Sequence, residues 1–214
     1  MKKIVLTGIT ILMILGFQSC SDSKKAKQTT EAKQEVQTSE DAATYSVNVT
    51  ESKINWLGQT VVTKHQGHIL FKSGEINLKE GVVESGSFVA DMNTIKSEDA
   101  TEEAVRNKLD EHLKAEDIFD AAQYPEAKFS ITSVKPLEGE YNTELEGNLE
   151  IKGISKNLSV KAYVQVEGDK VTLKTEKFTI NRQDFNVTYS NGNPQDKVIK
   201  DLFDIEIIIT ANKK

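Results

Sequence analysis

Apolar side chains recur at every second position along much of residues 45–214, and this alternation restricts the folds open to the chain. Successive side chains of a β-strand point to opposite faces, so a period of two places each apolar set on one face. Mostly polar residues stand between them, which indicates antiparallel sheet with one face in water. The sets are Tyr45, Val47 and Val49; Ile54 and Trp56; Ile69 and Phe71; Ile76 and Leu78; Phe88, Ala90 and Met92; Phe129 and Ile131; Leu145, Leu149 and Ile151; Leu158, Val160, Ala162, Val164 and Val166; Val171 and Leu173; Phe178 and Ile180; and Phe203, Ile205, Ile207 and Ile209.

Short stretches that contain glycine separate these sets and are typical of turns. Strands of this kind build a sandwich or a barrel, and a closed barrel leaves no exposed edge. We therefore expect an all-β domain at residues 45–214, built of antiparallel strands as two stacked sheets or as a barrel. A barrel of about eight strands would have an interior that holds side chains or one ligand. The turn candidates are KSGE (72–75), KEGV (79–82), LEGEYN (137–142), KGISKN (152–157), EGDK (167–170) and SNGNP (190–194).

One segment, residues 99–115, has a helical pattern instead. Val105, Leu109 and Leu113 follow one another at spacings of four and so lie on one stripe of a helix. Asp99 with Glu102 predicts a capping box at its start. A single amphipathic helix in a barrel chain is expected to cap or line the barrel interior, with Phe119 and Tyr124 extending the plug.

The N-terminus has the order of a secretory signal peptide over residues 1–19, because Lys2 and Lys3 precede an apolar run that is short for a membrane span. Phe17 and Ser19 before Cys20, the only cysteine, resemble the lipobox of bacterial lipoproteins. The resemblance implies cleavage before Cys20 and its acylation, hence a membrane anchor. An ordinary secreted protein with a stray cysteine is the alternative.

Residues 20–44 contain one large aliphatic side chain, Val36, and predict a flexible tether, with a helical tether as the alternative. The net charge is −6, and the chain has no basic patch. Nucleic acid is therefore not an expected partner.

Several motifs resemble those of the YceI-like family of lipid- and polyisoprenoid-binding proteins. They are HILFKSGEINL (68–78), HLKAEDIFDAAQYPEAKF (112–129), GNLEIKGISKNLSVKA (147–162), FTINRQDFNV (178–187) and DLFDIEIIITA (201–211). The resemblance implies an extended lipocalin-like barrel whose tunnel holds one amphiphile, such as an isoprenoid quinone or a fatty-acid derivative. It also implies a periplasmic setting and frequent homodimers. The chain departs from the family at Tyr45, where a Trp is common, and at Asn186, where many members have Gly; Asn tolerates the positive φ of such a turn.

Nothing in the sequence indicates catalysis or a metal site. His65 and His68 are three residues apart, which on a strand places them on opposite faces, and His112 has no second ligand nearby. Glycine-rich phosphate loops, Gly-x-Ser-x-Gly and His-Glu-x-x-His are absent. We expect a protein that is not an enzyme and carries no cofactor.

The predicted ligand contacts are mostly apolar residues of the inward faces. Arg182 shares a face with Phe178 and Ile180, and two roles remain open for it: a salt bridge to Asp184, Asp201 or Asp120, or contact with a ligand head group at the tunnel mouth. The full set is Trp56, Phe71, Phe88, Met92, Leu109, Leu113, Phe119, Tyr124, Phe129, Ile131, Phe178, Ile180, Arg182 and Phe203.

Three functions compete. The first is an anchored binder of an isoprenoid or acyl lipid, for transport, storage or sequestration. The second is a structural or interaction lipoprotein whose barrel is filled by its own side chains. The third is an enzyme acting on a lipid, which would need His112, Asp117 or Arg182 to cluster. Because Ser21 rather than Asp follows Cys20, we expect a cell-envelope lipoprotein of the outer membrane that faces the periplasm.

Overall fold

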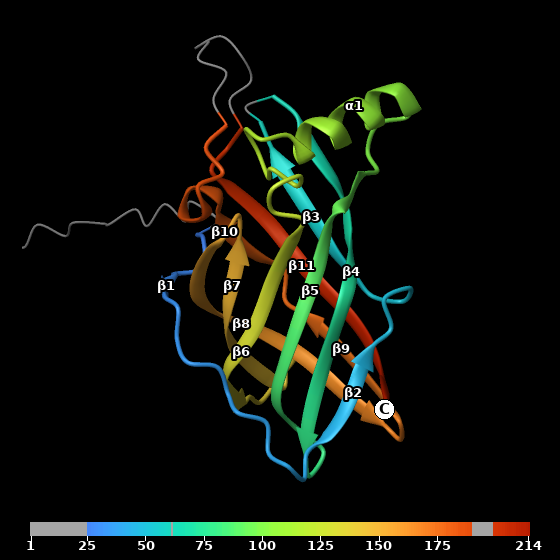
Figure 1. Cartoon of the computed structure of the whole chain (residues 1–214), viewed down its shortest axis with the longest axis vertical. Coiled ribbons are helices and arrows are strands. Elements are labelled where there is room, and N and C mark those ends of the chain that lie inside the picture. Colours follow the sequence, from blue (N-terminus) through green and yellow to red (C-terminus); the bar gives the residue numbers. More distant parts are fainter. Residues whose placement is uncertain (1–24, 61, 190–198) are drawn as a thin grey trace, which may run out of the picture.

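The computed structural model describes residues 25–60, 62–189 and 199–214. Its described part is an antiparallel β-barrel with one α-helix at one end (Figure 1). The elements are β1 (Thr30–Glu31), β2 (Ala43–Val47), β3 (Lys53–Gln59), β4 (Lys64–Lys79), β5 (Val82–Ser97), α1 (Glu103–Lys114), β6 (Glu126–Pro136), β7 (Thr143–Ile151), β8 (Ile154–Glu167), β9 (Lys170–Thr175), β10 (Phe178–Asn181), a 3-10 turn η1 (Arg182–Phe185) and β11 (Leu202–Lys213).

Eight strands close the ring. Each of the strands β3 to β9 pairs with the next one along the chain, with α1 inserted between β5 and β6, and β11 pairs with both β9 and β3 to complete the circle. The short strands β2 and β10 also pair with β11, and so extend the wall at its two ends. The expected all-β, antiparallel barrel of about eight strands is confirmed.

Strand β4 runs through residues 72–75, where the sequence pattern predicts a turn, so that turn is wrong. Phe71 pairs with Ala90 and Ser73 with Val89, which leaves Lys72 as the extra residue of a β-bulge. A bulge shifts the alternation by one residue, and so Ile69 and Phe71 share the inner face with Ile76 and Leu78. The predicted KEGV turn is present, with Glu80 and Gly81 at φ of 52° and 81°. The SNGNP turn lies outside the described residues.

The end of the barrel away from α1 is packed by its own side chains. Ile76, Val171 and Ala211 have no exposed surface there, and Leu78 is 3% exposed. These residues belong to a core cluster that continues toward the middle of the barrel. Among the described residues, the space inside the barrel therefore lies at the helix end and in the middle.

The helix differs from its prediction in extent and in docking. It spans Glu103–Lys114, and its N-cap Glu102 makes no side-chain cap hydrogen bond, so the predicted capping box is wrong. Asp99 instead accepts hydrogen bonds from His65 and from the amide of Gln66. Val105 is 49% exposed, so the predicted stripe is not buried along its length.

A polar contact holds the helix to the barrel. Asp110 is 3% exposed and accepts hydrogen bonds from the amide and the hydroxyl of Ser97 in β5, both at 2.7 Å. A buried carboxylate needs such partners, and Lys96 lies 3.4 Å from its other oxygen. The hydrophobic periodicity missed this contact because its central residue is charged.

Residues 25–44, the described part of the predicted tether, lie along the outside of the barrel, and we call them the strap (Figure 1). The amide of Lys27 donates to the carbonyl of Thr179 at 2.7 Å, and β1 pairs with β8. Farther along, the amide of Val36 donates to the carbonyl of Ile131 at 3.1 Å. Residues 25–44 are therefore bound to the barrel and do not form the flexible tether that their composition predicts. Cys20 and the signal segment lie outside the described residues.

No helix in the described part of the chain combines the length and the apolar character needed to span a bilayer.

Candidate functional site

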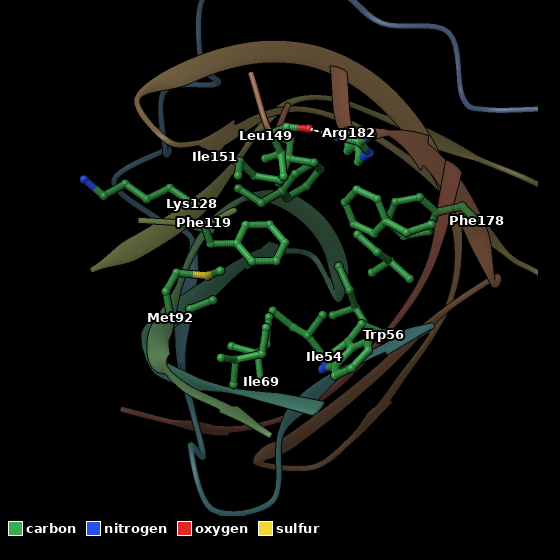
Figure 2. Close-up of a pocket in the computed structure, with 18 of the residues that line it drawn as sticks. Ile54, Trp56, Ile69, Met92, Phe119, Lys128, Leu149, Ile151, Phe178 and Arg182 are labelled. Carbon is green, nitrogen blue, oxygen red and sulfur yellow. Dashed lines mark hydrogen bonds between the residues drawn. The ribbon is translucent and has the colours of Figure 1, made fainter. Parts of the chain in front are cut away.

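An apolar cavity lies inside the barrel at the helix end and the middle (Figure 2). It offers about 170 Å³ to the centre of a water molecule, and the empty space between and beside its lining atoms, open solvent included, is about 1450 Å³. The lining residues come from the ring strands, from the end of α1 and the segment after it, from β10 and η1, and from described residues between η1 and β11. They are Ile54, Trp56, Gly58, Ile69, Phe71, Phe88, Ala90, Met92, Ile95, Leu113, Ile118, Phe119, Ala127, Lys128, Phe129, Leu145, Leu149, Ile151, Leu158, Val160, Leu173, Thr175, Phe178, Arg182, Val187, Tyr189, Ile199, Lys200, Phe203, Ile205, Ile207 and Ile209.

Ten of the fourteen predicted ligand contacts lie in this wall. They are Trp56, Phe71, Phe88, Met92, Leu113, Phe119, Phe129, Phe178, Arg182 and Phe203. Their contact with a ligand stays a prediction, but the barrel does bring them around one space.

The other four lie elsewhere. Leu109 is on the helix, but only Leu113 of the predicted stripe reaches the cavity wall. Tyr124 belongs to the turn after the helix, and its ring lies beside Gly153. Ile131 and Ile180 are 1% and 0% exposed and pack in the core outside the cavity wall. The cavity wall does not include these four, because apolar character and a shared face do not tell core from lining; their contact with a ligand stays a prediction.

The segment after α1, rather than the helix itself, supplies the plug. The helix ends at Lys114, and the amide of Phe119 then donates to the carbonyl of Leu113 at 3.2 Å. This tight turn buries Ile118 at 4% exposure and directs Phe119 into the ring of lining side chains (Figure 2). Asp120 follows at φ 47° and redirects the chain toward β6.

Sequence reasoning missed many of the lining residues. Ile54, Ile69, Leu149 and similar residues stood in the alternating sets, and their shared face with Trp56 or Phe71 was the signal that predicts lining. Val187, Tyr189 and Ile199 carried no such signal, because they lie beyond regular strands and only the fold of the η1 region brings them in.

Three aromatic rings pack against one another in the wall. Phe88 lies edge-on to Phe71, with ring centroids 6.4 Å apart, and is stacked with Phe129 at 6.5 Å. Gly147 makes room for this group: a Cβ atom there would lie 2.3 Å from the ring of Phe129. The glycine therefore leaves room for the tip of the Phe129 ring against strand β7.

Arg182 is 6% exposed and is held by the protein itself. Its guanidinium donates to the carbonyl oxygens of Val187, Lys200 and Ile199, the last at 3.2 Å, and forms a salt bridge with Asp201 at 3.0 Å. Asp201 is one of the three partners named in the salt-bridge alternative. These contacts account for the buried charge without a ligand.

The turn around Arg182 also shows how Asn186 takes the place where many family members have glycine. That residue has φ 53° and ψ 33°, the left-handed conformation, and its amide donates to the carbonyl of Gln183. Asparagine thus takes the conformation that glycine would adopt more easily, as expected.

The other cations near the cavity are engaged or turned away. Lys128 extends away from the other lining side chains (Figure 2) and pairs with Glu126 at 3.5 Å. Lys200 donates to Gln59 at 3.3 Å. The cavity therefore presents apolar surface to whatever enters it.

The histidines form separate pairs with carboxylates. His65 contacts Asp99 at 2.8 Å, and His68 contacts Glu98 at 2.7 Å. Burial raises the pKa of Asp99, but hydrogen bonds from His65 and the Gln66 amide outweigh it, so the pKa lies below its usual range. Within the described ranges, no three His, Cys, Asp or Glu side chains are grouped to hold a metal ion.

Comparison with known proteins agrees with the fold. The barrel superposes on BcnA of Burkholderia cenocepacia with a TM-score of 0.63 at 20% identity, covering 78% of this chain and 99% of BcnA. A polyisoprenoid-binding domain from Saccharophagus degradans, implicated in plant cell wall breakdown, gives 0.59 at 12% identity, with 79% and 98% covered. At these identities the likeness concerns the fold alone.

Sequence relatives match shorter stretches. A UPF0312 protein of Pseudomonas savastanoi pv. phaseolicola is 41% identical over 59 residues, which is 28% of this chain and 30% of the relative. Protein YceI of Salmonella arizonae is 32% identical over 89 residues, covering 39% and 45%. The matched regions thus span less than half the length of these relatives. The YceI-like domain family, by contrast, matches residues 45–211, nearly the whole barrel. The chain belongs to the YceI-like family.

Proposed function

We propose that this protein is a membrane-anchored, periplasmic lipid-binding protein that holds an isoprenoid or fatty-acyl chain in its barrel, for transport, storage or sequestration. The observation that carries the proposal is the apolar cavity enclosed by the inner faces of the strands and by Phe119. The fold it shares with a polyisoprenoid-binding domain supports the same reading.

The size of the cavity suits a ligand segment of about ten carbon atoms. A space of about 170 Å³ for water centres admits roughly ten to fifteen water-sized groups. Burying ten methylene-sized groups contributes about 8 kcal/mol before the costs of binding. That is enough to retain a lipid through apolar contact, and an isoprenoid chain and an acyl chain satisfy it equally.

The head group is expected to remain at the helix end. The polar side chains of the wall, including Arg182 and Lys200, gather there and already have protein partners. An amphiphile therefore enters with its chain toward the packed end, and its polar group stays near the cavity mouth.

The test is native mass spectrometry of the protein purified without detergent from its own host. A co-purified hydrophobic mass that is lost on organic extraction supports the proposal. Protein that stays ligand-free, and does not take up farnesol or a fatty acid when offered, supports the side-chain-filled barrel instead.

Anchoring is tested separately. We propose that the signal is residues 1–19, that Cys20 carries the acyl chains and that the protein lies in the outer membrane facing the periplasm. Labelled palmitate should enter the wild-type protein and not Cys20→Ala, and protease added to intact cells should leave it uncleaved. Palmitate in both proteins, or in neither, contradicts anchoring at Cys20; cleavage in intact cells contradicts the periplasmic orientation.

A further inference from the structure

We infer that the strap, residues 25–44, fixes the orientation of the barrel on the membrane, so that the helix end, where the cavity lies, faces the bilayer. The inference rests on the anchoring at Cys20 in the proposed function. In this inference the strap is a fixed support and not a flexible tether. The membrane surface is then the partner of the helix end of the barrel.

The strap begins at the wall of the cavity. The amide of Lys27 bonds to Thr179 of β10, and the hydroxyl of Thr29 donates to Asp184 of η1 at 3.0 Å. The inner faces of the same two elements carry Phe178 and Arg182, which line the cavity. The chain therefore reaches the barrel on the outside of the cavity wall, not at the packed end.

The strap is held along its length. Asn148 of β7 accepts from the amide of Lys33 at 2.9 Å and donates to its carbonyl at 2.7 Å, and Lys33 also pairs with Glu146. Ser39 is bound through its amide and its hydroxyl to Glu84, at 2.9 and 2.5 Å. Such paired contacts fix a segment more firmly than its polar composition suggests.

Two asparagines on the outer face indicate that the strap is part of the folded structure. Asn148 and Asn157 alternate with inward residues of β7 and β8, yet they are only 9% and 1% exposed. Asn157 donates to Asn148 and to Thr132, so the amides under the strap have partners. An outward polar side chain is buried only when something covers it, and the strap is the cover.

The bound strap makes the link to Cys20 short. Four residues lie between Cys20 and Lys25, and the five Cα–Cα steps across them reach at most roughly 18 Å. A free segment to residue 44 would instead wander on the order of 25–30 Å, and extend much farther. With acyl chains on Cys20, the outer wall beside the cavity is confined near the head groups.

The far end is held away from the membrane. The β6–β7 loop, residues 137–142, lies at the end opposite α1, and strands of up to 16 residues separate the two ends. At about 3.3 Å per residue and a tilt near 40°, this is roughly 40 Å along the barrel axis. Val62 and Val105, 67% and 49% exposed, lie at the helix end and present apolar side chains to the membrane side.

The experiment measures which end faces the bilayer. The mature chain is coupled through the Cys20 thiol to a maleimide lipid in phosphatidylcholine vesicles that also carry a rhodamine head-group lipid. A donor dye is placed through p-azidophenylalanine at Asn107 on the helix or at Glu140 in the far loop, both exposed. Energy transfer to the membrane is compared between the two positions.

The comparison variant releases the strap without touching the barrel. Lys27→Pro with Lys33→Pro removes two strap amides that donate hydrogen bonds, one of them beside the cavity wall. Glu35→Pro is the matched control, because among the described residues its amide has no acceptor. Hydrogen exchange verifies that the strap is released in the first variant, and circular dichroism verifies that both barrels are folded.

We expect transfer from position 107 to exceed transfer from position 140 by about twofold or more, given the separation of the ends. The difference should persist in Glu35→Pro and collapse in the double variant. Equal transfer in the wild type, or an unchanged difference after strap release, overturns the inference. Because coupling replaces natural acylation and no ligand is measured, absence of palmitate or of a bound lipid would instead count against the proposed function.

Discussion

Filling the cavity with one larger side chain should weaken ligand binding without weakening the fold. Ala90 is suited to this test because it is 3% exposed, lies on β5 between Phe71 and Ala127, and lines the cavity. Ala90→Leu adds three carbon atoms that point into the empty space.

The magnitude follows from the displaced ligand. Each methylene that leaves the cavity loses about 0.8 kcal/mol, so three cost about 2.4 kcal/mol, or roughly 60-fold in affinity. The free energy of unfolding should stay the same or rise, since the added atoms fill a void. Opposite effects on binding and stability distinguish this outcome from general damage to the fold.

The matched control is Ala211→Leu. Ala211 has no exposed surface and pairs with Val47 and Val171 in the packed end, outside the cavity wall. The same three atoms have no space there, so we expect a loss of about 1–3 kcal/mol in stability. The assays are displacement of a dansyl-labelled fatty acid by farnesol and urea unfolding.

Two results would refute the reasoning. Unchanged affinity in Ala90→Leu would mean that the ligand does not occupy the cavity beside β5. A loss of stability as large as that of the control would mean that the space is already filled.

Three further outcomes are expected. Arg182→Ala should lower stability by about 2–4 kcal/mol, since the buried guanidinium's hydrogen bonds to three carbonyls, that of Val187 being buried, are lost. Ligand affinity of the folded protein should change little; a large affinity loss at unchanged stability in urea unfolding would support the head-group role instead. Asp110→Ala should cost about 1–3 kcal/mol in the same assay, because the buried amide of Ser97 loses its acceptor, whereas a neutral result would mean that the helix docks without it. Hydrogen bonds from the hydroxyl and amide of Ser39 hold the pKa of Glu84 below its usual range. This strap contact therefore persists above the pKa of an unfolded glutamate, about 4.3, and is lost as pH falls through the lower folded value. An NMR titration of the Ser39 amide with its midpoint at or above about 4.3 would contradict this.

The barrel was predictable from the chain because its signal is local. Alternation of apolar residues marks a strand face wherever two sheet faces differ in solvent contact, and glycine turns mark the ends of hairpins. The same rule failed at KSGE, where the bulge at Lys72 shifted the alternation and imitated a chain break. An inserted residue and a turn both interrupt the alternation of apolar residues, so the sequence pattern alone does not distinguish them.

The candidate site was only partly predictable. Trp56, Phe71 and Phe129 were assigned to the interior from their faces, and the cavity does lie there. Whether an inward residue lines a void or fills the core, as Ile180 does, depends on neighbours that are distant in sequence. Packing is a property of summed volumes, which no single strand pattern contains.

By itself the sequence determined the inward and outward faces, the all-β class and the family, since each is written in short-range periodicity or in contiguous motifs. Only the tertiary structure decided that Asp110 seats the helix, that Arg182 is satisfied by carbonyls beyond a turn, and that residues 25–44 are bound to the barrel wall. These three depend on hydrogen bonds between polar groups far apart in the chain. A polar residue looks the same in sequence whether its partner is water or another strand, so such contacts emerge only when the fold brings both partners together.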